Sequence, residues 1–474
     1  MNALRKYLME QLEKAEKDID TKQQWRAGYH LMPPVGWLND PNGLCMYQGE
    51  YHVFFQYSPF DVEGGLKFWG HYKSKDMIHW DYVGVPLFSD QPFDMHGVYS
   101  GCALVEKEKM YLYYTGNVKL EGDFDYINTG RESYTVFVES DDGIHFKDKE
   151  CIMTQKDYGE GLTLHVRDPK VWKEEQYYMV LGARTKEDKG VVLLYASEDK
   201  KHWKFQNTIT TEQKFGYMWE CPDLFFLDGQ RILSVSPQGL KAEQRNYQNI
   251  HQSGYFLLQG DMTGKYTLEN FKEWDRGFDF YAPQTFLDEK GRRILIAWAG
   301  IPDEKGYTNP TIKDGWQHML TMPRELKWKN GKIYQVPVEE FQQLRGEQIE
   351  VKNHMLVYPS FELEYQNKSG ESFFVEIEKD IKIAFNKEQQ YFEISFKGEI
   401  GAGRKSRSVS LKQCDKMTLF VDQSILEIYI NDGEEVFCTR FYPQNSKIML
   451  YYHCNIKNCK LWNTKSYSIR RNFV

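Results

Sequence analysis

One short pattern occurs three times in the chain and constrains the fold more than any other feature. It consists of serine, any residue, aspartate, two residues, histidine and an aromatic residue, and its copies are SKDMIHW (74–80), SDDGIHF (140–146) and SEDKKHW (197–203). Each copy follows a strand-like run, and its aspartate is placed to bond the backbone of a hairpin turn. Repeated multi-stranded units of this size are typical of propeller blades, which need several copies to close. The three histidines are therefore expected to be scaffold and not catalysts.

Strand-like runs separated by turn residues continue after about residue 25. The clearest are YHVFFQY, KMYLYYTG, SYTVFVES, QYYMVLGA, GVVLLYAS, RILSVS and RILIAWAG. A hairpin and a connecting segment follow at 327–345, and the alternating runs beyond them predict a second all-β unit, a sandwich. The sequence thus predicts an all-β protein with a helix at 1–25, a propeller at 26–330, a linker at 331–348 and a sandwich at 349–474.

The N-terminal segment and the composition exclude several classes of protein. An apolar stripe of Leu4, Leu8, Leu12, Ala15 and Ile19 predicts an amphipathic helix packed on the body of the protein. No run approaches the length of a membrane span, and the N-terminus has no apolar signal core. A net charge of −8 without a basic stripe argues against nucleic acid as a partner. Eight scattered cysteines without a metal-binding pair predict free thiols and a cytoplasmic location.

Three acidic residues lie in turn-like surroundings among aromatic strands. Asp40, in WLNDPNG, could cap its turn or face a pocket. Asp168 follows Arg167 in HVRDPK, and a neighbouring arginine favours an ionised acid. Glu220, in MWECPD, has apolar neighbours that would raise its pKa towards that of a proton donor. Carboxylates on separate strands among aromatic rings, which pack well on sugar faces, suggest glycoside hydrolysis.

The three acid motifs, in this order, resemble glycoside hydrolase family 32, the β-fructofuranosidases. FFQY, FWGH, YSG, DFYAPQTF and TMPREL match the family as well, so that the resemblance spans nearly the whole first domain. VDQSILEIYINDGE (421–434) resembles the family's C-terminal sandwich. The resemblance implies a five-bladed propeller followed by that sandwich. It is nearest to a bacterial branch that hydrolyses sucrose 6-phosphate, which shares YHLMPPVGWLNDPNG, GLKFWGH and TGNVKLEGDFDY.

Roles for individual residues follow from this resemblance. It implies that Asp40 is the nucleophile, Glu220 the acid/base and Asp168 the stabiliser of the transition state. Two displacements through a fructosyl ester of Asp40 would retain the anomeric configuration and require carboxyls about 5–5.5 Å apart. No metal or organic cofactor is called for. The implied sugar contacts are Trp37, Leu38, Asn39, Gln56, Trp69, Tyr99, Ser100, Arg167, Tyr281 and Trp298.

One position departs from the family pattern and bears on the substrate. Many members carry a tryptophan eight residues after the glutamine of the FFQY motif, whereas this chain has Gly64. Trp69 or another aromatic residue could compensate, and members of the sucrose-6-phosphate branch often lack the same tryptophan. A phosphate site needs lysine or arginine near the glucose. Lys67 and Arg131 are candidates, although either could be an ordinary surface residue.

Several alternatives remain open on the sequence alone. Within the family, they are hydrolysis of unphosphorylated sucrose or short fructo-oligosaccharides and fructosyl transfer to a sugar. Outside it, they are an arabinan- or xylan-acting propeller hydrolase and a non-catalytic sugar-binding propeller. The sandwich is expected to pack against the propeller, and a homo-oligomer is left open.

Overall fold

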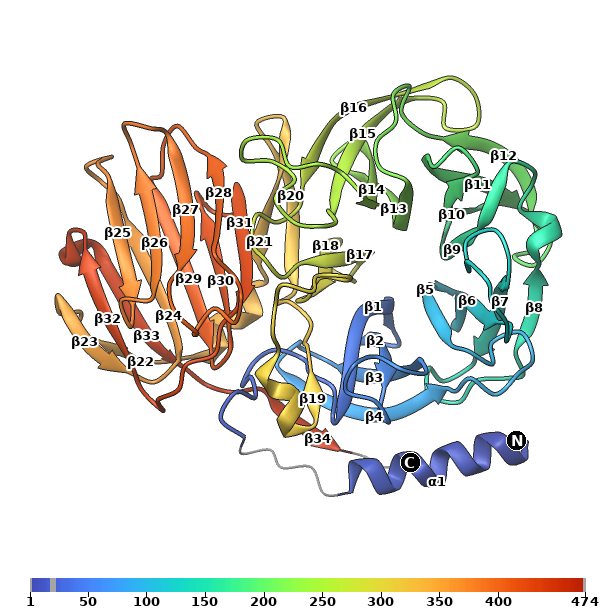
Figure 1. The fold of residues 1–474 in the computed structure, drawn as a ribbon, viewed down its shortest axis with the longest axis horizontal. Coiled ribbons are helices and arrows are strands. Elements are labelled where there is room, and N and C mark those ends of the chain that lie inside the picture. Colours follow the sequence, from blue (N-terminus) through green and yellow to red (C-terminus); the bar gives the residue numbers. More distant parts are fainter. Residues whose placement is uncertain (1, 18–22, 472–474) are drawn as a thin grey trace.

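The chain forms a propeller with a sandwich at its side, as the computed structural model of residues 2–17 and 23–471 shows (Figure 1). Within these residues five sheets surround a central axis, and each contributes four consecutive blade strands. The innermost strand of each blade is β1, β5, β9, β13 or β17 (Figure 1). The all-β prediction and the five-bladed architecture are confirmed.

The propeller strands follow one another around the axis in chain order. Blade one holds β1 (Gly36–Tyr47), β2 (Glu50–Ser58), β3 (Phe68–Ser74) and β4 (His79–Leu87). Blade two holds β5 (Val98–Glu106), β6 (Lys109–Lys119), β7 (Arg131–Ser140) and β8 (Glu150–Met153). Blade three holds β9 (Leu162–Lys173), β10 (Tyr177–Thr185), β11 (Gly190–Ser197) and β12 (Lys204–Ile209). Blade four holds β13 (Met218–Leu227), β14 (Gln230–Gln238), β15 (Gly254–Gly260) and β16 (Tyr266–Glu273). Blade five holds β17 (Tyr281–Leu287), β18 (Arg293–Trp298), β20 (Arg324–Lys329) and β21 (Lys332–Pro337).

The repeated serine–aspartate–histidine pattern forms the turn between the third and fourth strands of the first three blades. In each copy one aspartate oxygen accepts the backbone N–H of the histidine, at 2.7–2.8 Å for Asp76, Asp142 and Asp199. The other oxygen contacts Nδ1 of the same histidine at 2.6–2.7 Å. The histidine side chains are exposed. These contacts confirm that the repeat is scaffold.

The sandwich consists of two six-stranded sheets. One has the order β22-β33-β24-β29-β30-β31 and the other β23-β32-β25-β26-β27-β28. Their strands are β22 (Arg345–Ile349), β23 (His354–Val357), β24 (Ser360–Gln366), β25 (Phe373–Ile377), β26 (Ile381–Asn386), β27 (Tyr391–Phe396), β28 (Ser406–Ser410), β29 (Lys416–Asp422), β30 (Ile425–Ile430), β31 (Glu435–Arg440), β32 (Ile448–His453) and β33 (Cys459–Thr464).

The predicted linker at 331–348 contains regular structure. Lys332–Pro337 form β21, which pairs with β20 across the predicted hairpin, so this part is the outer strand of blade five. The 3-10 helix η3 (Glu339–Leu344) follows and leads into β22. We therefore propose that the propeller extends to Pro337. The last strand, β34 (Ser468–Arg471), leaves the sandwich and pairs in parallel with β4 of blade one.

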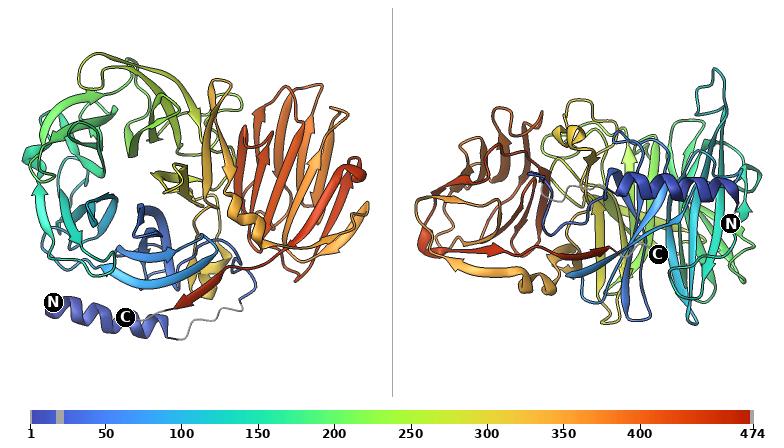
Figure 2. Two further views of the ribbon diagram at one scale, coloured as in Figure 1. Left: turned by 180° about the vertical axis from the view of Figure 1, so that it is seen from behind. Right: turned by 90° about the horizontal axis from the view of Figure 1, so that it is seen from below.

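Helix α1 (Ala3–Glu16) lies along the outer side of the propeller (Figure 2). Leu8 and Leu12 are buried against blade one, whereas Leu4 is exposed. The buried Glu16 carboxylate accepts hydrogen bonds from the hydroxyls of Tyr57 (2.8 Å) and Tyr82 (2.7 Å). The helix is thus packed on the body as predicted, while Ile19 lies outside the described residues. Among the helices that the structure describes, none is long and apolar enough to cross a membrane.

Buried ion pairs join the two domains. Arg324 of blade five contacts Glu427 of the sandwich at 2.8 Å, and both side chains are fully buried. Asp279, just before β17, accepts hydrogen bonds from Arg404 (2.6 and 2.7 Å) and from Arg440 (3.0 Å), both of the sandwich. Removing one partner of a buried pair leaves a buried unpaired charge, which is strongly destabilising. The predicted packing of the sandwich against the propeller is confirmed.

Candidate active site

All five innermost strands carry a β-bulge at the same place, where two residues oppose a single residue of the next strand. A bulge re-aims side chains, and it lets two consecutive residues face the same side. Three bulge residues have backbone angles in the left-handed region, with φ of 64° at Asp168, 47° at Cys221 and 50° at Ala282. Such strain clusters at functional sites. The bulged pairs are Asn39-Asp40, Tyr99-Ser100, Asp168-Pro169, Cys221-Pro222 and Ala282-Pro283.

The bulges of blades one, two and three line a cavity of about 1400 Å³, together with the residues just before the other two bulges, Glu220 and Tyr281. All five blades and the segment from Ile301 to Pro310 contribute to its wall. The structure brings eleven of the residues predicted from the sequence to this one cavity. They are Asp40, Asp168, Glu220, Trp37, Asn39, Gln56, Tyr99, Ser100, Arg167, Tyr281 and Trp298.

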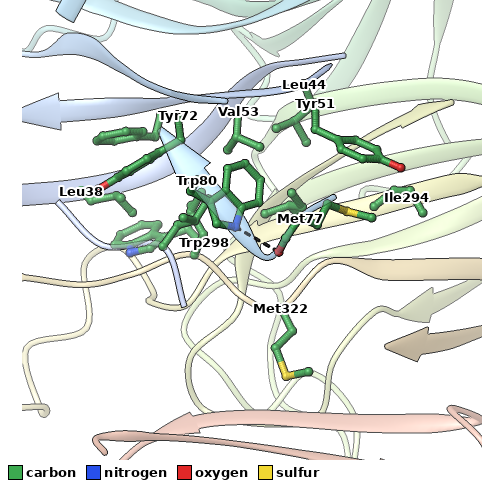
Figure 3. Close-up of a cluster of buried hydrophobic side chains, with 14 of the residues drawn as sticks. Leu38, Leu44, Tyr51, Val53, Tyr72, Met77, Trp80, Ile294, Trp298 and Met322 are labelled. Atoms are coloured by element: carbon green, nitrogen blue, oxygen red, sulfur yellow. Dashed lines mark hydrogen bonds between the residues drawn. The ribbon is translucent and has the colours of Figure 1, made fainter. Parts of the chain in front are cut away.

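Two predicted sugar contacts do not reach the cavity. Leu38 has no exposed surface and lies in the cluster of buried side chains shown in Figure 3, because alternation along β1 turns it away from Trp37 and Asn39. Trp69 is also fully buried, and its indole N–H donates to the backbone oxygen of Tyr99 at 3.1 Å. Both predictions were wrong, since these side chains support the wall from behind.

The Asp40 carboxylate is held by a chain of hydrogen bonds that all point towards it. Ser100 donates a short hydrogen bond to Oδ2, and Asn39 Nδ2 donates to Oδ1 at 3.0 Å. Gln56 in turn donates to Ser100 Oγ at 2.7 Å and accepts from Asn39 at 2.6 Å. Burial raises the pKa of Asp40, the bonds from Ser100 and Asn39 oppose that rise, and the charge of Glu220 adds to it. The network therefore fixes the orientation of the carboxylate and favours its ionised form.

Glu220 has polar partners on both oxygens, which differs from the apolar surroundings predicted from its neighbours in sequence. Oε1 accepts two hydrogen bonds from Arg167, at 2.9 Å from Nε and 2.6 Å from Nη2. Oε2 accepts from the hydroxyl of Tyr281 at 2.6 Å and from Gln238 Nε2 at 2.8 Å. No sequence signal pointed to Gln238. These bonds hold the carboxyl in one orientation at the cavity wall.

Asp168 lies deeper than Glu220 and has fewer charged contacts than the sequence suggested. Arg167 approaches its carboxylate only to 4.0 Å, since the guanidinium is committed to Glu220. Oδ2 accepts the backbone N–H of Cys221 at 2.9 Å, and the Asp168 N–H donates to Thr115 Oγ1 at 2.9 Å. Burial raises the pKa of Asp168 to about 7; Arg167 opposes this and Glu220 adds to it. The expectation that Arg167 keeps this acid ionised is therefore not met.

The Cys221 thiol lies between two of the acids and was not predicted as part of the site. Its Sγ is 3.8 Å from Asp40 Oδ2 and 3.6 Å from Asp168 Oδ2. The three acid-bearing blades therefore converge around one side chain. An alignment of the three short motifs NDP, RDP and ECP could have pointed to Cys221, since it precedes a proline just as Asp40 and Asp168 do.

Lys67 borders the space next to Gly64, where many family members have a tryptophan. A Cβ built on Gly64 would lie 3.0 Å from Lys67 Nζ and 3.2 Å from the Trp37 ring, and φ is +97° there. The Lys67 ammonium lies 4.9 Å from the centre of the Trp37 ring. Burial lowers the pKa of Lys67 to about 7, against the charge of Asp40. The space beside Gly64 is thus bordered by Lys67 and the Trp37 ring, and the buried Trp69 does not reach it. Both Lys67 and Arg131 line the cavity.

Three carboxylates from three blades thus face one cavity that also presents hydroxyl, amide and indole groups. Acids so placed are the equipment of an enzyme that breaks glycosidic bonds, in which one carboxylate attacks and another transfers protons. The fold and the site therefore define a propeller glycoside hydrolase.

Comparison with known proteins gives the family. The model described as "Glycosyl hydrolases family 32 N-terminal domain" matches residues 30–337, and the model of the family's C-terminal domain matches 341–463. The chain belongs to glycoside hydrolase family 32, a conclusion that confirms the resemblance.

Individual relatives cover almost the whole chain. A sucrose-6-phosphate hydrolase of Bacillus subtilis is 40% identical over 93% of both chains, and one of Vibrio alginolyticus is 39% identical over 87% of this chain and 86% of the relative. The solved sucrose-6-phosphate hydrolase of Lactobacillus gasseri superposes with a TM-score of 0.86 at 30% identity, covering 97% of this chain and 96% of the other. A Bombyx mori family 32 β-fructofuranosidase, solved as a mutant in complex with sucrose, has a TM-score of 0.85 at 28% identity and covers 99% and 100%.

Proposed function

We propose that the protein is a retaining β-fructofuranosidase that hydrolyses sucrose 6-phosphate. The observation that carries the proposal is the meeting of Asp40 and Glu220, from blades one and four, at one cavity where the charge of Glu220 acts on Asp40. The names of the relatives at 40% and 39% identity support the phosphorylated substrate.

In the first step Asp40 attacks C2 of the fructosyl unit while the bond from C2 to the glucosyl oxygen breaks. Glu220 gives its proton to that oxygen, and a fructosyl ester of Asp40 forms. Ser100 and Asn39 orient the attacking oxygen through their hydrogen bonds to Asp40. The two bonds from Arg167 stabilise the Glu220 carboxylate that remains after the proton has left.

In the second step Glu220 acts as a base. It takes a proton from a water molecule, whose oxygen attacks C2 and displaces Asp40. Asp168 accepts a hydrogen bond from the backbone of Cys221, which follows Glu220 in the chain and whose thiol contacts Asp40. Its carboxyl group is therefore placed to hold fructose hydroxyls and to stabilise the positive charge that develops on the ring. Two inversions at C2 give net retention.

A second candidate is hydrolysis of unphosphorylated sucrose or short fructo-oligosaccharides. The Bombyx mori relative solved with sucrose favours it, since that enzyme is similar over the whole chain. The same three acids serve either substrate, and the two proposals differ only at the glucosyl end. We also propose a cytoplasmic location, which the eight cysteines without disulfide bonds support.

The test is a comparison of kcat/KM for sucrose 6-phosphate and for sucrose in the purified protein. A clear preference for the phosphorylated sugar is expected, and equal values would remove the phosphate from the proposal. NMR of freshly released fructose tests the mechanism separately. We expect the β anomer first, and the inverted anomer would contradict the assignment of Asp40 as nucleophile.

A further inference from the structure

Two cations stand opposite each other where the loop of the β6–β7 hairpin joins its two strands. Lys119 ends β6, Arg131 begins β7, and the two residues are directly paired across the strands. Like charges directly opposite each other in a sheet destabilise it. The Lys119 ammonium lies 5.7 Å from the centre of the Tyr126 ring, and Tyr126 lines the active-site cavity. A pair of this kind calls for a negative group nearby.

Arg131 has no ion-pair partner among the described residues, although it lines the cavity. Its Nε is buried and has no hydrogen-bond partner. The other two arginines of this part of the wall are paired. Arg167 holds Glu220, and Arg184 contacts Asp188 at 2.5 Å. An unpaired buried charge is costly, so the guanidinium of Arg131 is the group on this wall that remains free for an anion.

The surroundings of Arg131 do not supply that anion, because Glu220, the acid whose charge acts on it, is already paired with Arg167. Burial and the charges of Arg167, Arg131 and Arg184 lower the pKa of His165, on the same wall, to about 2. The carboxylate in the β6–β7 hairpin loop that lines the cavity is Asp125, and its Oδ1 accepts three backbone N–H groups of its own loop. Asp125 is therefore committed to the loop.

Arg131 lines the cavity together with Glu220, and the charges of the two residues act on each other. The charge of Arg131 also interacts with Tyr99, whereas Lys67, the other cation considered for a phosphate, interacts with Asp40 and lies over Trp37. Glu220 is the proposed donor to the glucosyl oxygen, so the glucose lies on the Glu220 side of the broken bond. A guanidinium also binds a phosphate through two parallel hydrogen bonds, which an ammonium cannot provide.

We propose that Arg131 is the binding residue for the 6-phosphate of the glucosyl unit, at the point where the β6–β7 hairpin loop returns to the sheet. This inference rests on the proposed function, because it assigns the part of the site that separates sucrose 6-phosphate from sucrose. It makes the hairpin of blade two the determinant of substrate choice, while blades one, three and four supply the acids.

The test measures the ratio of kcat/KM for sucrose 6-phosphate to kcat/KM for sucrose in the wild type, Arg131→Gln, Arg131→Lys and Arg184→Gln. We expect Arg131→Gln to lower the ratio about 10- to 100-fold through KM, as loss of a hydrogen bond to a charged group would. Arg131→Lys should fall in between, since it keeps the charge and loses the paired geometry. Arg184→Gln is the matched control, because it removes an arginine of the same wall that already has a partner, and it should change the ratio less than about threefold.

Inhibition of sucrose hydrolysis by glucose 6-phosphate and by glucose provides a second measurement. The wild type should bind glucose 6-phosphate more tightly than glucose, and Arg131→Gln should lose this difference. If the wild type prefers sucrose 6-phosphate and Arg131→Gln keeps that preference, or if Arg184→Gln lowers the ratio equally, the assignment of Arg131 is overturned and the proposed function stands. If the wild type itself has a ratio near one, the proposed function fails instead.

Discussion

The rim and the centre of the propeller use aspartate in opposite ways. At the rim, the repeated turns keep both the residues and the contacts the same, and each aspartate is satisfied within its own turn. At the centre, every innermost strand carries a bulge, but the residues in or beside it differ from blade to blade and include Asp40, Ser100, Asp168, Cys221 and Ala282. The rim therefore repeats a sequence in three blades, whereas the centre repeats only the presence of a bulge, which holds different chemical groups.

The rim and the centre shift the pKa values of their aspartates in opposite directions. Hydrogen bonds from the backbone and side chain of His202 lower the pKa of Asp199. Burial raises the pKa of Asp40 and of Asp168, because nothing local fully compensates their charge. An acid satisfied by its own turn is scaffold, and a buried acid whose contacts come from other blades is a candidate for catalysis.

The largest expected effect separates these two settings directly. Asp40→Asn should lower kcat by at least about 10³-fold, because the amide cannot attack C2, while the dissociation constant for sucrose 6-phosphate changes little. Asp199→Asn makes the same change of atoms at the rim and is the matched control. It should keep kcat within about twofold and lower the free energy of unfolding by at most about 1 kcal/mol. Turnover and calorimetric binding check both variants, and near-normal turnover of Asp40→Asn would remove its role.

The second-largest effect is expected for Asp168, the acid proposed to stabilise the transition state. At a pH above the raised pKa of Asp168, where its carboxylate is ionised, Asp168→Asn should lower kcat by about 10²–10³-fold, since it removes negative charge from beside the developing oxocarbenium ion. No fructosyl bond to this residue is expected, so the products should keep the retained configuration. A fall below about tenfold would place Asp168 with the rim acids, as a structural group.

A smaller effect is expected for the hydrogen bonds that orient the nucleophile. Ser100→Ala should lower kcat/KM about tenfold, because it removes a bond to the charged form of Asp40. The same bond lowers the pKa of Asp40 against burial, so its loss lets that pKa rise. The acidic limb of the pH profile of kcat/KM should therefore move to higher pH. An unmoved limb would show that Ser100 only fills space.

The smallest effect is on stability. Burial raises the pKa of Asp168 in the folded protein, whereas an aspartate in the unfolded chain ionises near about pH 4. Between these two pKa values the folded state binds more protons, so the free energy of unfolding falls as the pH rises. Asp168→Asn should remove the share of this fall that comes from Asp168, so that the free energy of unfolding depends less steeply on pH between pH 4 and pH 8. Unfolding curves of both proteins over this range would show it. Equal slopes would contradict the raised pKa.

Much of this arrangement is visible in the sequence. Apolar and aromatic alternation predicts the strands, turn residues predict the hairpins, and three short motifs predict the acids. What periodicity does not give is the effect of the bulges. A bulge lets Arg167 and Asp168 serve the same cavity although they are neighbours, so Arg167 pairs with Glu220, from another blade.

The two predicted sugar contacts that do not reach the cavity, Leu38 and Trp69, are buried for different reasons. Leu38 lies between two cavity residues in the chain and yet faces the core. It precedes the bulge at Asn39-Asp40, so its side chain still follows the regular alternation of the strand. Trp69 lies on β3, the third strand of blade one, and packs between blades one and two. Only the three-dimensional structure reveals that Lys67 borders the space at Gly64 and that Arg131 Nε has no hydrogen-bond partner among the described residues.

The central claim is that Asp40 bonds to the sugar while Glu220 handles the proton. Its most direct test uses Glu220→Ala with β-fructofuranosyl fluoride, whose leaving group needs no proton. After rapid denaturation and digestion, mass spectrometry should find one fructosyl unit on the peptide that contains Asp40. A fructosyl unit on the peptide of Asp168, or fluoride release with no modified peptide and an inverted product, would contradict the account.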